Sequence, residues 1–383
     1  MDDRNKSSWI TGLRGQPIAG YLGGRDNNLN LIRIVAASAV LVSHAFALTS
    51  GDVMNEPFRT STGLSLGQFA VAIFFGMSGL LIARSFDRKQ SLAHFLSARF
   101  LRLWPALTVV LVLTAFVLGP IVTSLPVAEY LLSGQTLAYV PRNLSLAFRH
   151  DFLPGVFAQN PDGASTNGSL WSLFYEVACY GGVVIAGYFG ALRKGWRFLV
   201  LMVLVLAGHG WSVIAQPASG LFYRLDVLGF VGFPFVLGMA AYVWRNHLPL
   251  SLIGIGVSWG VVALLWGTIW LSSSVMLALI YTSLWLAFVP KSAALAYNRF
   301  GDFSYGVYIF AFPVQQSLIV FQPGHGPAFN MTVSGLVTFS LAYASWHLVE
   351  KRALALVRPA GDWLVGLRSS RQQASGKADE AVV

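Results

Sequence analysis

The sequence contains few charged residues. Only 11% of its 383 residues are Asp, Glu, Lys or Arg, whereas soluble domains carry about 25%. In contrast, 55% of the residues are hydrophobic and the mean hydropathy is +0.61. Such a chain has too little charge to cover a water-exposed surface, so we expect a protein that spans a membrane several times.

Cysteine is almost absent. Cys179 is the one cysteine, which excludes an intramolecular disulfide bond and a cysteine-based metal site. The sequence also lacks a GxSxG motif, a Walker loop and an HExxH motif. The N-terminal residues contain no apolar signal-peptide core, so we expect no cleavage. No metal is implied by any motif in the sequence.

Ten apolar segments can be drawn along the chain. Each is expected to be helical, because backbone groups find no water partners in lipid. The sequence therefore predicts an all-α, polytopic membrane helical bundle with about ten transmembrane helices. The segments are approximately Leu29–Leu48, Gly67–Arg84, Leu103–Thr123, Ser169–Gly190, Phe198–Ile214, Val227–Trp244, Leu250–Leu271, Ser274–Val289, Phe303–Phe321 and Met331–Val349.

The basic residues indicate the orientation of these segments. The formal net charge is +10, but the basic residues form short clusters between apolar runs, which argues against nucleic-acid binding. If both termini are cytoplasmic, most Lys and Arg residues face the cytoplasm, as the positive-inside rule requires. The outer loops then keep only four basic residues, Arg59, Arg142, Arg149 and Arg224.

This topology divides the chain into three parts. Residues 1–28 form a polar cytoplasmic N-terminal segment, and residues 29–352 form the membrane domain. Residues 353–383 form a polar cytoplasmic tail, which we predict to be disordered. A long polar stretch at about 124–168 lies outside the membrane and is rich in turn-forming residues. Loops of this length are usually functional or disordered.

The first apolar segment carries two ionisable residues, Arg33 and His44. Their spacing corresponds to about 1,100° of rotation, so both lie on one stripe of a helix, about 16 Å apart along its axis. Ionisable groups at membrane depth are costly and usually functional. Taken singly, His44 could be a helix-end histidine bonded to a loop, and Arg33 could extend to the interface. Their shared stripe favours function, with His44 as a general base.

The fourth segment contains a carboxylate, Glu176, in the stretch SLWSLFYE. An unpaired carboxylate in a membrane would be costly, so we expect a partner, either His44 or an arginine. Trp171, Ser172 and Tyr175 flank it. They are candidates for a carbohydrate site, and they are equally typical of an interfacial aromatic belt.

Two arginines, Arg99 and Arg102, precede the third segment in SARFLRLWP. They share a helix face at the cytoplasmic mouth. Paired guanidinium groups suit phosphate recognition, although a simple positive-inside anchor explains them too. In the second segment, small residues that include Gly76 and Gly79 predict close helix packing.

These motifs together resemble the acyltransferase-3 family of integral membrane O-acyltransferases. The resemblance extends from about Asn27 to Arg352, nearly the whole membrane part. Five motifs carry it in order: RIVAASAVLVSH, FFGMSGLLI, SARFLRLWP, SLWSLFYE and FSYGVYIFAFPVQQ.

The resemblance implies transfer of an acyl group, usually acetyl, from acyl-CoA to a sugar hydroxyl. The acceptor would be a cell-envelope or exported polysaccharide or its lipid-linked precursor, at the bacterial inner membrane. No bound cofactor is implied, and a separate polysaccharide assembly protein is a conceivable partner. The candidates for donor binding are Arg33, Ser78, Arg99 and Arg102. The candidates for catalysis are His44, Arg33 and Glu176, with Glu176 orienting the His44 ring. The candidates for acceptor binding are Trp171, Ser172, Tyr175 and Tyr305.

One position departs from the family pattern. Many members have a histidine in the last motif, where this chain has Ala311. Any role of that histidine is absent here or falls to another residue, with Gln315 and Gln316 as candidates. The chain also lacks the hydrolase-like outer domain that some members carry.

Two other functions fit parts of the sequence. In a transporter or flippase of a glycan-type substrate, Arg33 and Glu176 would line a polar path without acyl transfer. The absence of an inverted repeat argues mildly against it. A non-catalytic scaffold would explain neither Glu176 nor the shared stripe of Arg33 and His44.

Overall fold

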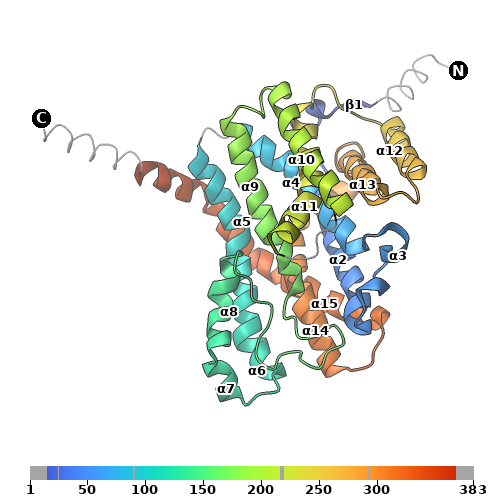
Figure 1. Cartoon of the computed structure of the whole chain (residues 1–383). Coiled ribbons are helices and arrows are strands. Elements are labelled where there is room, and N and C mark those ends of the chain that lie inside the picture. The colour runs from blue at the N-terminus through green and yellow to red at the C-terminus, as the bar shows by residue number, and fades with distance from the viewer. Residues whose placement is uncertain (1–14, 25, 89–90, 216–219, 292, 368–383) are drawn as a thin grey trace, which may run out of the picture.

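The computed structural model describes residues 15–24, 26–88, 91–215, 220–291 and 293–367 (Figure 1). Within these ranges the chain is almost entirely helical. The only sheet in the described ranges is an antiparallel pair of two-residue strands, β1 (Gln16–Pro17) and β2 (Pro249–Leu250). The predicted all-α class is therefore confirmed.

Helices occur in all ten predicted segments. Among the described residues, eight helices are long and apolar enough to cross a membrane, which confirms a multi-pass membrane protein. The remaining two segments correspond to α12 (Leu252–Leu264), which is shorter than a membrane span, and to α15 (Pro327–Ser345). The eight spans contain α2 (Leu29–Ser50), α4 (Leu66–Arg88), α5 (Leu92–Leu113) with η3 (Thr114–Leu118) and α6 (Gly119–Val122), η4 (Gly168–Leu170) with α9 (Trp171–Tyr188), α10 (Gly195–Ala215), α11 (Gly220–Val243), α13 (Leu271–Phe288) and α14 (Ser304–Phe321).

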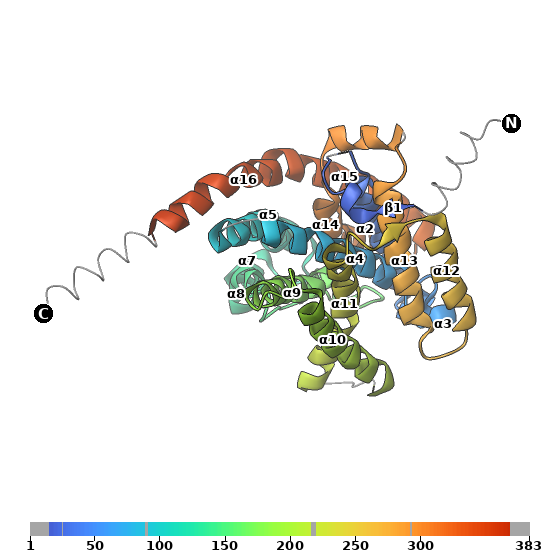
Figure 2. The ribbon, with the colours of Figure 1, turned by 90° about the horizontal axis from the view of Figure 1, so that it is seen from above.

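Helix α4 lies at the centre of the bundle, where it packs against α2, α9, α11 and α13. Figure 2 shows this central position from above, with α10 at the edge of the bundle. Glycine allows the closest approach: a Cβ atom on Gly79 would lie 2.0 Å from the carbonyl oxygen of Phe235 on α11. A Cβ on Gly238 of α11 would lie 1.8 Å from the Gly76 oxygen. The close packing predicted from Gly76 and Gly79 is thus confirmed.

The long polar stretch after α6 is folded. It begins with α7 (Val127–Leu132) and α8 (Gly134–Leu144), at the bottom of Figure 1. Its irregular remainder is bound to α14 through Gln316, whose Nε2 donates to the carbonyl oxygens of Gly163 and Ser165, each at 3.2 Å. The stretch therefore packs over one end of α14.

Both ends of the described chain lie on the opposite side from α7 and α8 (Figure 1). At the N-terminal end, the strand β1 is anchored on β2. At the C-terminal end, α15 continues through the π-helical turn η6 (Trp346–Glu350) and α16 (Lys351–Ala355), and residues 357–367 are also helical. Helical structure thus extends past residue 352, where we placed the start of the tail. The rest of that tail, residues 368–383, and residues 1–14 lie outside the described residues.

Candidate active site

Two cavities lie along α2. The inner cavity has a volume of about 340 Å³ and the outer cavity about 1560 Å³. Val71 and Tyr308 border both of them, so the cavities share a wall. The inner cavity is bordered by Arg33, Ser78, Arg99, Arg102, Glu176 and Asp302, among others. The outer cavity is bordered by His44, Glu56, Arg59, Trp171, Tyr175 and Arg224, among others.

Helix geometry explains how one element serves both cavities. Arg33 lies near the start of α2 and borders the inner cavity, while His44 lies three turns later and borders the outer cavity. The shared stripe predicted from their spacing therefore faces the two cavities in succession.

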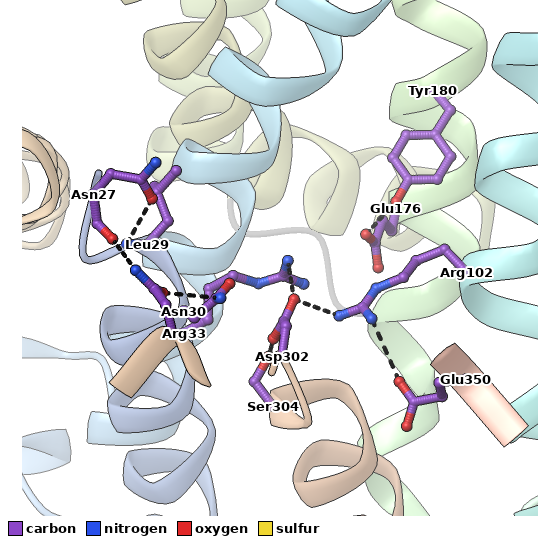
Figure 3. Close-up of polar contacts among 11 residues, drawn as sticks. Asn27, Leu29, Asn30, Arg33, Arg102, Glu176, Tyr180, Asp302, Ser304 and Glu350 are labelled. Carbon is purple, nitrogen blue, oxygen red and sulfur yellow. Dashed lines mark hydrogen bonds and ion pairs between the residues drawn. The ribbon is translucent and has the colours of Figure 1, made fainter. Parts of the chain in front are cut away.

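Asp302 joins two arginines of the inner cavity (Figure 3). Its Oδ2 lies 2.7 Å from Nη1 of Arg33 and 2.7 Å from Nη2 of Arg102. Ser304 donates its hydroxyl to Oδ1 at 2.6 Å. Burial alone would raise the pKa of Asp302, but Arg102 and Arg33 outweigh it and hold this pKa below its usual range. The carboxylate is therefore ionised at neutral pH and compensates part of the charge of both arginines.

Arg102 has a second carboxylate partner. Nη1 of Arg102 lies 3.4 Å from Oε2 of Glu350, whose side chain is 1% exposed. The hydroxyl of Ser345 donates to Oε1 of Glu350 at 3.1 Å. The π-helical turn η6 carries Glu350 to this position, and such turns are frequent at functional sites. The sequence indicated no role in the site for Asp302 or Glu350. Both lie far from Arg102 in the chain, so no local pattern indicates that they pair with it.

Arg99 differs from the other two arginines. Among the described residues it makes no ion pair, and its buried Nε has no hydrogen-bond partner. Its guanidinium lies over the ring of Tyr180, 5.8 Å from the centroid. Tyr180 in turn donates its hydroxyl to Glu176. Arg99 is thus the inner-cavity arginine that has no carboxylate partner among the described residues.

Glu176 lies on the side of the arginines. It borders the inner cavity and interacts electrostatically with Arg102. Figure 3 shows its side chain beside that of Arg102. The structure does not bring Glu176 together with His44, which borders the other cavity. Its hydrogen-bond partner is Tyr180, so neither His44 nor an arginine, the two partners expected from the sequence, is paired with it directly among the described residues. The expected orientation of His44 by Glu176 has no support in this geometry.

The carboxylate near His44 is Glu56, which acts on the imidazole electrostatically. Ser43, the residue before His44, donates its hydroxyl to Oε2 of Glu56 at 3.0 Å. The imidazole also meets the ring of Phe312 edge-on, with 5.4 Å between the centroids. Its buried Nδ1 has no hydrogen-bond partner in the described part of the chain. No sequence signal linked Glu56 to His44, because Glu56 lies in the loop after α2.

The four predicted acceptor residues divide between the two cavities. Trp171 and Tyr175 border the outer cavity, with their ring centroids 6.1 Å apart. Ser172 and Tyr305 border the inner cavity. Ser172 is hydrogen-bonded to the hydroxyl of Tyr308 at 2.7 Å, and Tyr305 donates its hydroxyl to the Leu103 carbonyl oxygen at 3.1 Å. The aromatic pair and His44 thus share one cavity.

Ala311 is buried in α14, and both neighbouring glutamines have structural contacts. Gln315 donates its amide to the carbonyl oxygen of Leu41 at 2.8 Å, whereas Gln316 binds the outer loop. Gln316 is engaged through both amide atoms, because its Oε1 also accepts from Asn160 at 2.7 Å, whereas the buried Oε1 of Gln315 has no partner among the described residues. Among the described residues, no group of three His, Cys, Asp or Glu side chains is placed to hold a metal ion.

The described helices form a multi-pass membrane bundle with half-buried arginines in one cavity and a histidine in the next. The sequence profile of the acyltransferase-3 family, described as an acyltransferase domain, matches residues 26–347, so the chain belongs to this family. The resemblance seen in the sequence is thereby confirmed, and acyl transfer is favoured over the transporter and scaffold alternatives.

Two curated proteins are similar to this chain over most of their length. An O-acetyl transferase of Shigella phage Sf6 is 31% identical over 346 residues, which cover 88% of this chain and 98% of the phage protein. Nodulation protein 10 of Rhizobium leguminosarum bv. viciae is 26% identical over 365 residues, which cover 89% of this chain and 96% of that protein. No solved structure matches the chain.

Proposed function

We propose that the protein transfers an acetyl group from acetyl-CoA to a sugar hydroxyl of a cell-envelope or exported polysaccharide, or of its lipid-linked precursor. The site of action is the bacterial inner membrane. One observation carries the proposal: Arg33 and His44 lie on one helix and border two cavities that share a wall. A donor and an acceptor could therefore approach one point from opposite sides.

The inner cavity suits the donor. Coenzyme A carries several phosphates, and guanidinium groups bind phosphate oxygens through paired hydrogen bonds. Arg99 has free donors, whereas Arg33 and Arg102 share Asp302. We infer that Arg99 makes the main phosphate contact at the mouth and that Arg102 and Arg33 shape the channel behind it. Ser78 borders the same cavity, where the narrow pantetheine arm would lie.

The outer cavity suits the acceptor. Trp171 and Tyr175 offer aromatic faces to a sugar ring, and His44 borders the same space. His44 would take the proton of the sugar hydroxyl while its oxygen attacks the thioester carbonyl. The C–S bond then breaks, and the coenzyme A thiolate receives the proton from the imidazolium. Glu56 would stabilise the imidazolium in the way that carboxylates assist catalytic histidines elsewhere.

Glu176 keeps a role on the donor side in this proposal. Through Tyr180, it fixes the ring over which Arg99 lies. Removing Glu176 is therefore expected to weaken donor binding more than it slows proton transfer at His44.

The direct test is mass spectrometry of surface glycans from cells that carry wild type or His44→Ala at equal membrane abundance. We expect acetylation to disappear in His44→Ala. His247→Ala is the matched control, because His247 is an exposed histidine in the turn after α11, away from both cavities. Glycans acetylated to the wild-type level in His44→Ala cells would refute the proposal.

A further inference from the structure

Arginine is rare on the outer side of this protein, yet it gathers at one place. In the predicted topology only four basic residues face outward, and three of them, Arg59, Arg149 and Arg224, border the outer cavity. The fourth, Arg142, is exposed on α8 and borders neither cavity. The positive-inside rule gives no reason for arginines on this side. Their convergence on the cavity of His44 therefore calls for a ligand.

The local partners leave these guanidinium groups with unused donors. Arg149 pairs with Asp151 at 2.7 Å through Nη2, and Arg59 donates from Nη1 to Oε1 of Gln68 at 2.6 Å. Arg224 makes no ion pair among the described residues, and its side chain is exposed. Because each arginine has five N–H donors, all three can bind a further oxyanion.

One arginine of the cavity has no carboxylate partner. Glu56 and Asp226 border the cavity, and each accepts a hydrogen bond from a serine, Ser43 and Ser212 respectively. Together with Asp151, which pairs with Arg149, three carboxylates match the three arginines in number. Arg224 nevertheless makes no ion pair among the described residues, so its exposed guanidinium favours an anionic ligand.

The positive charge lies beside the aromatic pair. The hydroxyl of Tyr175 interacts electrostatically with both Arg224 and Arg149. Trp171 packs against the same ring. A ligand that stacks a sugar ring on Trp171 and Tyr175 would thus place a neighbouring substituent within reach of the two arginines.

We propose that the outer cavity contains an anion subsite, formed by Arg149 and Arg224, and that the acceptor is a glycan bearing a carboxylate or phosphate group near the acetylated sugar. This inference rests on the proposed function. An acidic sugar and the diphosphate of a lipid-linked saccharide present the same chemistry, an oxyanion that a guanidinium binds with two hydrogen bonds. The subsite would hold the acceptor so that its reacting hydroxyl lies next to His44.

The test uses purified full-length protein, acetyl-CoA, and polymeric and lipid-linked glycan fractions from cells that lack the protein. Each fraction is assayed intact and after removal of its anion, by reduction of carboxyl groups to alcohols or by mild acid release of the diphosphate. We expect one treatment to raise the KM for the acceptor by about 10- to 100-fold, the value of a charge-assisted hydrogen bond. The KM for acetyl-CoA should not change, and the effective treatment identifies the source of the anion.

Arg224→Gln supplies the matching change in the protein. It should raise the KM for the intact acceptor by about tenfold. On the neutralised acceptor it should change the KM less than about twofold, because the anion that Arg224 would bind is already removed. Arg224→Lys should restore part of the affinity for the intact acceptor. Arg142→Gln is the control and should match wild type. A KM that neither treatment changes, or equal effects of Arg224→Gln and Arg142→Gln, would overturn the subsite. Transfer by wild type to no fraction would refute the proposed function itself, and the subsite with it.

Discussion

The replacement Asp302→Asn tests whether the inner cavity depends on its central ion pair. It keeps the size of the side chain and removes the charge that Arg33 and Arg102 share. Both guanidinium groups approach the same oxygen at 2.7 Å. The asparagine would remove one negative charge from a site where solvent reaches little of these side chains.

The structure sets the expected loss of stability in Asp302→Asn. Removing one partner of a buried ion pair typically destabilises a protein by about 3–5 kcal/mol. Arg33 is 24% exposed and Arg102 keeps Glu350, so we expect the lower value, about 3 kcal/mol. With an unfolding entropy of roughly 2.1 cal/mol/K per residue over 383 residues, the unfolding midpoint should fall by about 4 °C.

The single cysteine provides the assay. Cys179 is 8% exposed, so a thiol-reactive fluorophore labels it when the detergent-solubilised protein unfolds on heating. Asp362→Asn is the matched control, because Asp362 pairs with His94 at 3.0 Å but is 75% exposed, and such pairs contribute about 0–1 kcal/mol. If Asp302→Asn and Asp362→Asn unfold at the same midpoint at pH 7, the pairing of Asp302 with the two arginines does not stabilise the fold.

Three further outcomes follow from the same geometry. The stability difference between wild type and Asp302→Asn should be complete at pH 7 and should shrink in acid. Because the folded-state pKa of Asp302 is lowered, its stabilising contribution is present above the ordinary pKa of about 3.9 and is lost as the pH falls through the lower folded-state value. Thermal unfolding at several pH values checks this. Arg99→Ala should raise the KM for acetyl-CoA about tenfold or more, while Arg88→Ala, at the exposed end of α4, should not. Glu56→Gln should lower kcat by at least about tenfold with both KM values unchanged, and a normal kcat in steady-state assays would exclude Glu56 from the support of His44.

The sequence predicted what depends on local geometry. A bilayer forces the apolar segments into helices, and helical periodicity then places Arg33 and His44 on one stripe without any knowledge of the neighbouring helices. The aromatic pair of Trp171 and Tyr175 follows from the same periodicity, because three or four residues separate neighbours on a helix face. These features needed no tertiary information.

The partners of the charged residues could not be predicted. Asp302 and Glu350 lie 200 and 248 residues from Arg102 in the chain, and only the packing of α5, α14 and η6 brings them together. Glu176 is the exception: its depth in the membrane indicated a need for a partner, and the observed partner, Tyr180, lies one turn later on the same helix, where helical periodicity places a neighbour. Glu56 lies in a loop, where no periodicity relates it to His44.

In the proposed function, donor and acceptor would meet at the wall between the two cavities. Tyr308 borders both cavities; it donates its hydroxyl to the Ser169 carbonyl oxygen at 2.7 Å and therefore accepts from Ser172. Reacting atoms must approach to about 3–3.5 Å, whereas Arg33 and His44 are about 16 Å apart along α2. In the proposed function, an extended donor arm that starts among the arginines would therefore have to reach past this tyrosine.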